Sequence, residues 1–112
     1  MIKEAIFAEL KSNRIKLAKV SFSGGNDEGS AESVTIIHND GYEEYFHYWG
    51  NSKDTPPPSW LKNIMDGLAE PIYDRYGGFA GDFSVYGSYI WDTENNKCYF
   101  DGQESSYAPI PN

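Results

Sequence analysis

The chain has 112 residues, with 17 acidic against 9 basic side chains and a formal net charge of −8. A chain of this length has room for one hydrophobic core, so we expect a single domain. We do not expect direct nucleic-acid binding, because a protein that binds the phosphates of nucleic acid needs clustered Lys and Arg. One cysteine, Cys98, excludes an internal disulfide, and neither a secretory signal nor an apolar run of membrane length is visible. The sequence therefore predicts a soluble, cytoplasmic protein.

The first elements expected are a helix and a strand. Residues 2–12 carry Ile2, Ile6 and Leu10 at a four-residue spacing, which is typical of a short amphipathic helix. Residues 15–22 change to a two-residue period, which predicts a strand with Ala18 and Val20 on one side. A glycine-rich turn is expected directly after this strand, over residues 23–29.

Two further strands are expected over residues 33–38 and 42–49, which are rich in β-branched and aromatic side chains. Asn-Asp-Gly at residues 39–41 lies between them and is a strong hairpin signal. The faces on which His38 and His47 lie relative to each other depend on whether the loop has two or three residues, so the register stays open.

A second helix is expected from about residue 59 to Tyr76. Three successive prolines before it indicate an extended connection, and Ser59 is the expected N-cap. Pro71 predicts a kink rather than an end, because Ile72 keeps the apolar arc in phase. We expect this arc to form a principal part of the core: Trp60, Leu61, Ile64, Met65, Leu68 and Ile72.

The last two strands are expected over residues 85–93 and 97–101, around a turn at residues 94–96. The order helix, three strands, helix, two strands predicts an α+β fold with a mainly antiparallel five-stranded sheet and both helices packed on one face. The predicted domain spans residues 1–102, and residues 103–112 are a polar C-terminal tail.

Two turns combine glycines with acids. Because glycine tolerates positive φ, we expect one such residue in each Gly-Gly pair. The acids argue against a phosphate loop, which needs a following helix and a lysine. If the turns meet in space, their acids, with Glu32, can form a composite site for a divalent metal or a small ligand. The residues of the two turns are Gly24, Gly25, Asp27, Glu28 and Gly29, and Gly77, Gly78 and Asp82.

The same turns resemble two motifs of a family of small uncharacterised bacterial and mobile-element proteins. The first motif is residues 20–29 with Glu32, and the second is residues 76–82 with Gly87 and residues 90–92. The chain departs from the family pattern at Glu28, where a small residue is expected, and at Phe79, where tryptophan is usual. The family has no assigned activity, so the resemblance implies the fold and the pairing of the motifs only.

Other candidate sites have simpler interpretations. Asp92, Glu94 and Asn96 alternate like the first ligands of a calcium loop, but Lys97 replaces the loop glycine and Gln103 the final glutamate, which favours a hairpin tip.

His38 and His47, with Glu43 and Glu44, could form an acid–base pair or half a metal site, although ordinary sheet-face residues are favoured. Cys98 alternates with Phe100 and is expected to be an inert core thiol.

Aromatic residues on the strand at residues 42–49 carry the functional prediction. Rings fall on both faces of this strand, but only one face can pack on the helices, so exposed rings beside acids predict a protein-binding surface. Its expected residues are Tyr42, Glu43, Glu44, Tyr45, Tyr48 and Trp49.

We expect a partner with a basic surface, for example a nucleic-acid-handling protein whose site is occupied by carboxylate mimicry. The alternative is a small-ligand or divalent-metal-binding protein using the two glycine-acid turns. An enzyme ranks third, and no cofactor is expected.

Overall fold

The computed structural model describes residues 2–25, 28–48, 56–76 and 83–106. It has two helices and five strands in the predicted order, which confirms the α+β fold. The elements are α1 (Lys3–Ser12), β1 (Ile15–Gly25), β2 (Glu28–His38), β3 (Glu43–His47), α2 (Ser59–Tyr76), β4 (Phe83–Asp92) and β5 (Lys97–Ser106).

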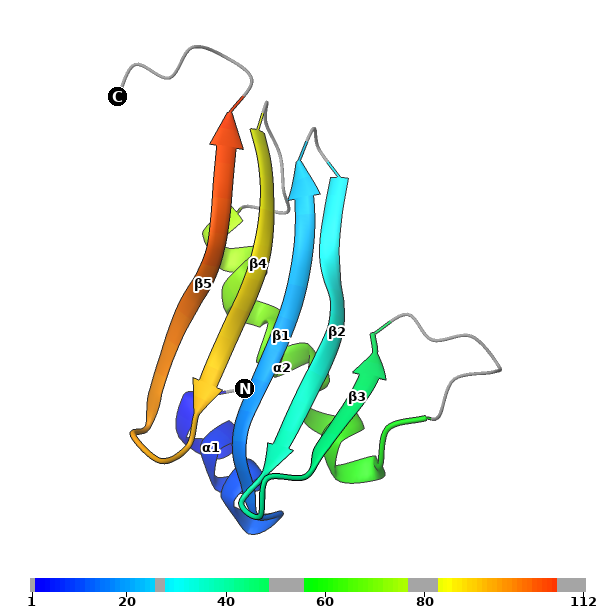
Figure 1. Cartoon of the computed structure of the whole chain (residues 1–112), viewed down its shortest axis with the longest axis vertical. Coiled ribbons are helices and arrows are strands. Elements are labelled where there is room, and N and C mark those ends of the chain that lie inside the picture. Colours follow the sequence, from blue (N-terminus) through cyan, green and yellow to red (C-terminus); the bar gives the residue numbers. More distant parts are fainter. Residues whose placement is uncertain (1, 26–27, 49–55, 77–82, 107–112) are drawn as a thin grey trace.

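The five strands form one antiparallel sheet in the order β3-β2-β1-β4-β5. The chain closes three hairpins with short connections, and α2 carries it from the β3 edge back to β4 beside the central strand β1. Both helices lie on one face of the sheet (Figure 1). The opposite face, called the helix-free face below, is covered by neither helix.

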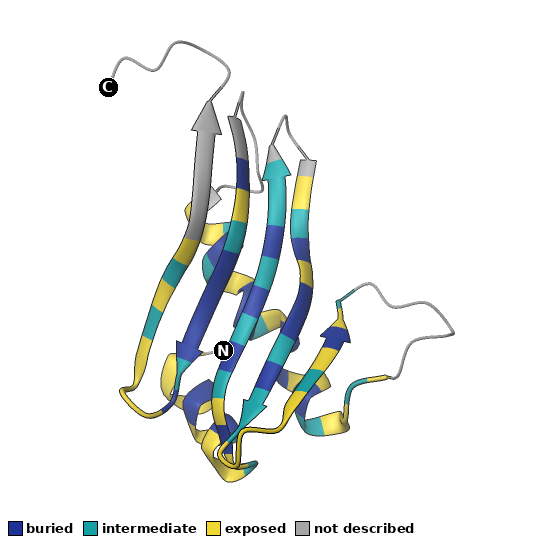
Figure 2. Cartoon of the chain, in the orientation of Figure 1, coloured by how far each residue is buried: buried dark blue, intermediate teal, exposed yellow. Residues whose placement is uncertain are grey.

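The core lies between the sheet and the two helices (Figure 2). Side chains of one parity on β1, β2 and β4 project into it, including Val20, Val34 and Trp91. The predicted arc of α2 is confirmed, because Leu61, Ile64, Met65, Leu68 and Ile72 are buried and Trp60 packs against them. Pro71 lies inside the helix as expected.

The start of α2 differs from the prediction by one residue. The N–H groups of Leu61 and Lys62 donate to the carbonyl of Pro58 at 3.1 and 3.0 Å. Ser59 is therefore the first helical residue, and the N-cap position falls on Pro58. Residues 77–82, which include the glycine pair expected to end this helix, lie outside the described residues.

The first glycine turn is shorter than predicted. β1 continues to Gly25, β2 begins at Glu28, and Gly24 pairs with Gly29. Gly24 and Gly25 are therefore strand residues, because a backbone that can complete hydrogen bonds across a ladder gains by doing so. The positive φ predicted for Gly24 or Gly25 is therefore wrong: among the described glycines, φ is positive at Gly29 and Gly87, where the backbone is nearly extended at 159° and 155°, and at Gly41, where it is 94°.

The β2–β3 hairpin has a three-residue loop, which resolves the open register. The N–H of Gly41 donates to the His38 carbonyl at 2.9 Å, and the N–H of His38 donates to the Tyr42 carbonyl at 2.8 Å. Such a loop takes a residue with positive φ in its last position. His47 pairs with Ser33 and His38 pairs with Ile15, so the two histidines lie on opposite faces of the sheet.

The β4–β5 hairpin also extends beyond its predicted end. β4 and β5 pair from Asp92 and Lys97 to Phe83 and Ser106. Residues 103–106, predicted to belong to the polar tail, are therefore strand residues.

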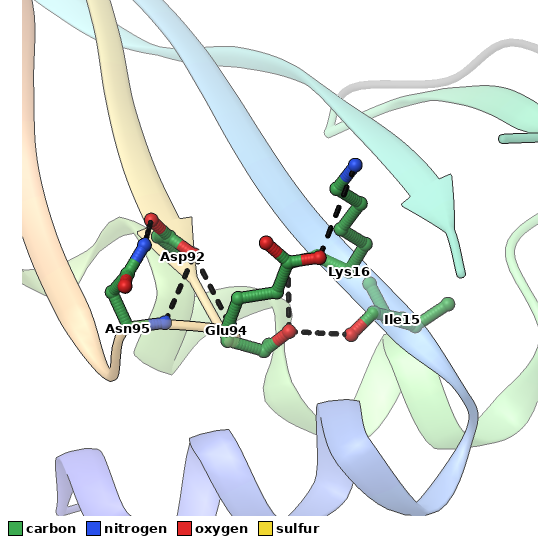
Figure 3. A network of polar contacts seen from close by, with 6 residues as sticks. Ile15, Lys16, Asp92, Glu94 and Asn95 are labelled. Carbon is green, nitrogen blue, oxygen red and sulfur yellow. Dashed lines mark hydrogen bonds and ion pairs between the residues drawn. The ribbon is translucent and has the colours of Figure 1, made fainter.

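A polar network closes the tip of the β4–β5 hairpin (Figure 3). The carboxylate of Asp92 accepts hydrogen bonds from the N–H groups of Glu94 and Asn95 and from Asn95 Nδ2, at 3.0, 3.3 and 2.8 Å. Thr93 Oγ1 donates to the carbonyl of Ile15 at 2.8 Å or to that of Lys16 at 2.7 Å, where β1 has a bulge. The predicted hairpin tip is confirmed, and the Asp92 carboxylate is engaged within it.

Candidate interaction surface

Cross-strand pairing arranges the helix-free face into rows. Paired residues in an antiparallel sheet project to the same side, so a row can be followed through the register. The central row crosses all five strands and consists of Tyr45, Thr35, Lys19, Ile90 and Tyr99. The rows on either side are His47, Ser33, Ser21, Ser88 and Asp101, and Glu43, Ile37, Leu17, Asp92 and Lys97.

Exposed tyrosines surround a buried middle on this face. Tyr45, Tyr86 and Tyr99 are 57, 58 and 46% exposed, whereas Ser33 and Ile90 between them are buried. Sequence analysis did not single out Tyr86 and Tyr99. Strand alternation could have predicted that Tyr99 is exposed, because it lies between Cys98 and Phe100, which were expected on the core side.

Five exposed residues of the β2–β3 hairpin are here called the hairpin surface: Asp40, Tyr42, Glu43, Tyr45 and His47. Glu43, Tyr45 and His47 form the end of the helix-free face at β3, whereas Tyr42 pairs with His38 and lies on the other side of the hairpin. Tyr42 is 62% exposed, and its N–H donates to the Asp40 carboxylate at 3.0 Å. The rings of Tyr45 and His47 meet edge to face, with centroids 4.9 Å apart. The hairpin surface therefore presents aromatic rings in defined positions beside acids.

Glu44 lies on the other side of β3, where it meets His38. Its Oε1 lies 2.6 Å from His38 Nε2, and both side chains are partly exposed. The ring of Tyr42 lies 5.5 Å from that of His38. The structure thus joins one of the predicted acid–base pairs, His38 with Glu44, and leaves His47 and Glu43 on the helix-free face.

Tyr48 is partly buried and faces the core. Its hydroxyl donates to the Met65 carbonyl at 2.7 Å, and its ring packs against the core. Burial raises its pKa far above the ordinary tyrosine value, and the charge of Asp66 adds to this. Tyr48 ties the end of β3 to α2. Trp49, the other predicted anchor, lies outside the described residues.

The β2–β3 edge of the sheet is acidic. Residues 20–52 contain no Lys or Arg. Within the described part of that segment, Glu32, Asp40 and Glu43 are exposed and Glu44 is partly exposed. The β4–β5 edge instead mixes Lys97 with acids. The negative potential of the protein is therefore unevenly distributed, and its acidic edge coincides with the hairpin surface.

A cavity of about 470 Å³, widely open to solvent, lies between α1, α2 and the β4–β5 hairpin. Its lining includes Lys3, Glu70, Asp74, Arg75, Tyr89 and Phe100. Lys3 Nζ lies 3.4 Å from the Tyr89 hydroxyl, and the Arg75 guanidinium lies 4.9 Å from the centre of the Phe100 ring. The cavity thus combines an aromatic wall with charges of both signs.

Cys98 is a partly buried thiol beside the Tyr89 hydroxyl. Burial raises the pKa of Cys98, so the protonated thiol is the form present near neutral pH. This environment agrees with the inert thiol predicted from the sequence.

The glycine-acid turns give no described site. Asp27, Gly77, Gly78 and Asp82 lie outside the described residues, and Glu32 is exposed on β2. In the described parts of the chain, no three His, Cys, Asp or Glu side chains are grouped so that they could hold a metal ion. Within the same parts, no helix is both long and apolar enough to cross a membrane.

Comparison of the chain with protein-family models, with curated proteins and with solved structures found no match. The resemblance of the two glycine motifs to a bacterial and mobile-element family stays a prediction.

Proposed function

We propose that this chain is a protein-binding module whose partner presents a basic surface. The observation that carries the proposal is the hairpin surface, in a segment without Lys or Arg. Tyr45 lies on the same side of β3 as Glu43, Tyr42 lies beside His38 on the other side, and both tyrosines are more than half exposed. Tyrosines contribute large contact areas at low entropic cost, and desolvated aromatic anchors dominate binding energy in many interfaces.

Charge and aromatic rings have separate roles in this proposal. The net charge of −8 and the acids of the hairpin surface attract a basic partner before contact and so raise the association rate. The rings of Tyr42 and Tyr45 lose water on contact and so slow dissociation. Glu44 contributes less, because His38 already engages its carboxylate.

We further propose that the partner's basic surface is one that otherwise binds nucleic acid. Exposed carboxylates at the β2–β3 edge then take the place of phosphates. The expected consequence is competition: duplex DNA or RNA, whichever the partner binds, displaces this protein. A partner that binds both at once contradicts this part of the proposal.

The test begins with capture of partners on an immobilised tagged chain at low salt. The variant Glu43→Lys, Tyr45→Ser removes one acid and one ring from the hairpin surface. The matched control, Asp66→Lys, Tyr86→Ser, makes the same change of charge at exposed positions outside it. We expect the control to retain the partner and the hairpin variant to lose it, with circular dichroism showing that both are folded.

Rates measured with the purified partner then separate the two roles. Glu43→Lys alone should mainly slow association and reduce its salt dependence, and Tyr45→Ser alone should mainly speed dissociation. Equal retention of the partner by the folded hairpin variant and by the control would contradict the proposed surface.

The cavity beside Arg75 favours a second candidate, the binding of a small ligand. Its volume of about 470 Å³ is within the range of ligand sites, and its polar groups of both signs suit a zwitterionic or aromatic compound. A thermal-shift screen of amino acids and nucleobases tests this candidate. Stabilisation that is lost in Glu70→Gln would support it, and a screen without stabilisation would remove it.

A further inference from the structure

β5 is a long strand at an edge of the sheet. It spans ten residues and pairs with β4 on one side, while no described strand lies on its other side. A long edge strand is a template for pairing with another strand. The opposite edge, β3, has only five residues and carries Glu43 and Glu44, which discourage such pairing.

The side chains of β5 are complementary to a second copy of the same strand. In an antiparallel pair centred on Tyr99, each Lys97 lies opposite the Asp101 of the other copy, and Tyr99 lies opposite itself. Lys97, Tyr99 and Asp101 are exposed and alternate along the strand, so both charge pairs and the ring pair lie on the helix-free face. On the other face, Cys98 lies opposite Phe100.

We propose that two copies of this chain associate through antiparallel pairing of their β5 strands, centred on Tyr99. The arrangement has two-fold symmetry, so the Lys97–Asp101 pair occurs twice, the Tyr99 pair lies on the axis and the assembly closes as a dimer. Cross-strand pairs of opposite charge and of aromatic rings each stabilise a sheet by about 0.2–1 kcal/mol. Repulsion between two chains of charge −8 opposes this gain, so the dimer depends on protein concentration.

The dimer joins two five-stranded sheets into one sheet with a continuous helix-free face. The two hairpin surfaces then lie at its opposite ends, roughly 40 Å apart from the strand spacing. This inference does not rest on the proposed partner, because the two surfaces occupy opposite edges of the sheet.

Charge reversal tests the proposed register. Lys97→Asp places like charges opposite each other at both pairs, and so does Asp101→Lys. We expect sedimentation equilibrium to show a concentration-dependent dimer for the original chain and a dissociation constant weakened about tenfold or more for each variant. An equimolar mixture of the two variants should dimerise again, because the two acids at positions 97 and 101 of one chain then face the two lysines at positions 101 and 97 of the other.

Matched controls change the same charges away from β5. Lys62→Asp and Asp66→Lys alter exposed residues of α2 and should leave dimerisation unchanged. Circular dichroism establishes that every variant is folded. A monomeric original chain at every concentration overturns the proposal, as does a dimer that survives both reversals. Assemblies that grow beyond two copies also overturn it, since the proposed contact closes.

Discussion

The indole Nε1–H of Trp91 donates a 3.0 Å hydrogen bond to the carbonyl of Leu68. Both side chains are fully buried, and Phe7 of α1 meets the Trp91 ring edge to face at 5.3 Å. Trp91 therefore joins β4 to both helices. The contact with α2 lies one turn before Pro71, which has no N–H to donate to the Gly67 carbonyl.

Leu68→Ala should lower the free energy of unfolding by about 2–5 kcal/mol, because it removes a fully buried side chain and leaves a cavity in the core. Tyr42→Ala, at a side chain 62% exposed, is the control and should change stability by about 0.5 kcal/mol or less. Urea denaturation followed by tryptophan fluorescence measures both. A silent Leu68→Ala would contradict the placement of α2 against the sheet.

Tyr48→Phe should destabilise the fold by about 0.5–1.5 kcal/mol near neutral pH, because it removes the hydrogen bond to the Met65 carbonyl and keeps the ring. The Met65 carbonyl is then left without the tyrosine donor. The affinity for the proposed partner should stay unchanged, since the Tyr48 side chain faces the core. A loss of affinity without a loss of stability would contradict this assignment.

Stability should fall at alkaline pH, and Tyr48 should contribute to the fall. Burial raises the pKa of Tyr48 in the folded state, whereas an unfolded tyrosine ionises near about pH 10. The folded state then binds more protons than the unfolded state, so the contribution is complete below about pH 10 and is lost as pH rises above it. Tyr48→Phe should reduce the slope of unfolding free energy against pH in that range. An unchanged slope would contradict the shift.

Thr93→Val should destabilise the fold by about 1–3 kcal/mol, because the buried hydroxyl that donates to the Ile15 or the Lys16 carbonyl at the β1 bulge is lost. Thr35→Val is the matched control. Thr35 lies in the central row of the helix-free face, where valine suits a strand, so this change should be close to neutral. Equal thermal shifts for the two variants would contradict the role given to Thr93.

Gly41→Ala should cost about 1 kcal/mol through backbone strain. A Cβ at Gly41 would meet no atom within 4 Å, so the φ of 94° is the remaining cause. Gly41→Asn should cost less, because asparagine tolerates this conformation better. Chemical denaturation of both variants checks the order, and an alanine variant as stable as the original chain would contradict it.

Periodicity within single elements determined much of this fold in advance. The apolar arc of α2 was readable from Leu61 to Ile72 because a helix brings every third and fourth residue to one side. The short connections between most strands left an antiparallel sheet with both helices on one face as the simplest arrangement. The exposed position of Tyr45 followed from the same alternation that buries Phe46.

Contacts between elements decided what periodicity could not. Local sequence allowed two loop lengths at Asn39, and only pairing of the whole hairpin placed His38 with Glu44 and His47 on the other face. Local sequence also favoured a turn at Gly24 and Gly25, whereas hydrogen bonds between β1 and β2 extended the strands through these residues. Tyr48 faces the core, where the Met65 carbonyl accepts a hydrogen bond from its hydroxyl. These outcomes depend on hydrogen bonds between different strands and helices, whose partners the periodicity within one element does not specify.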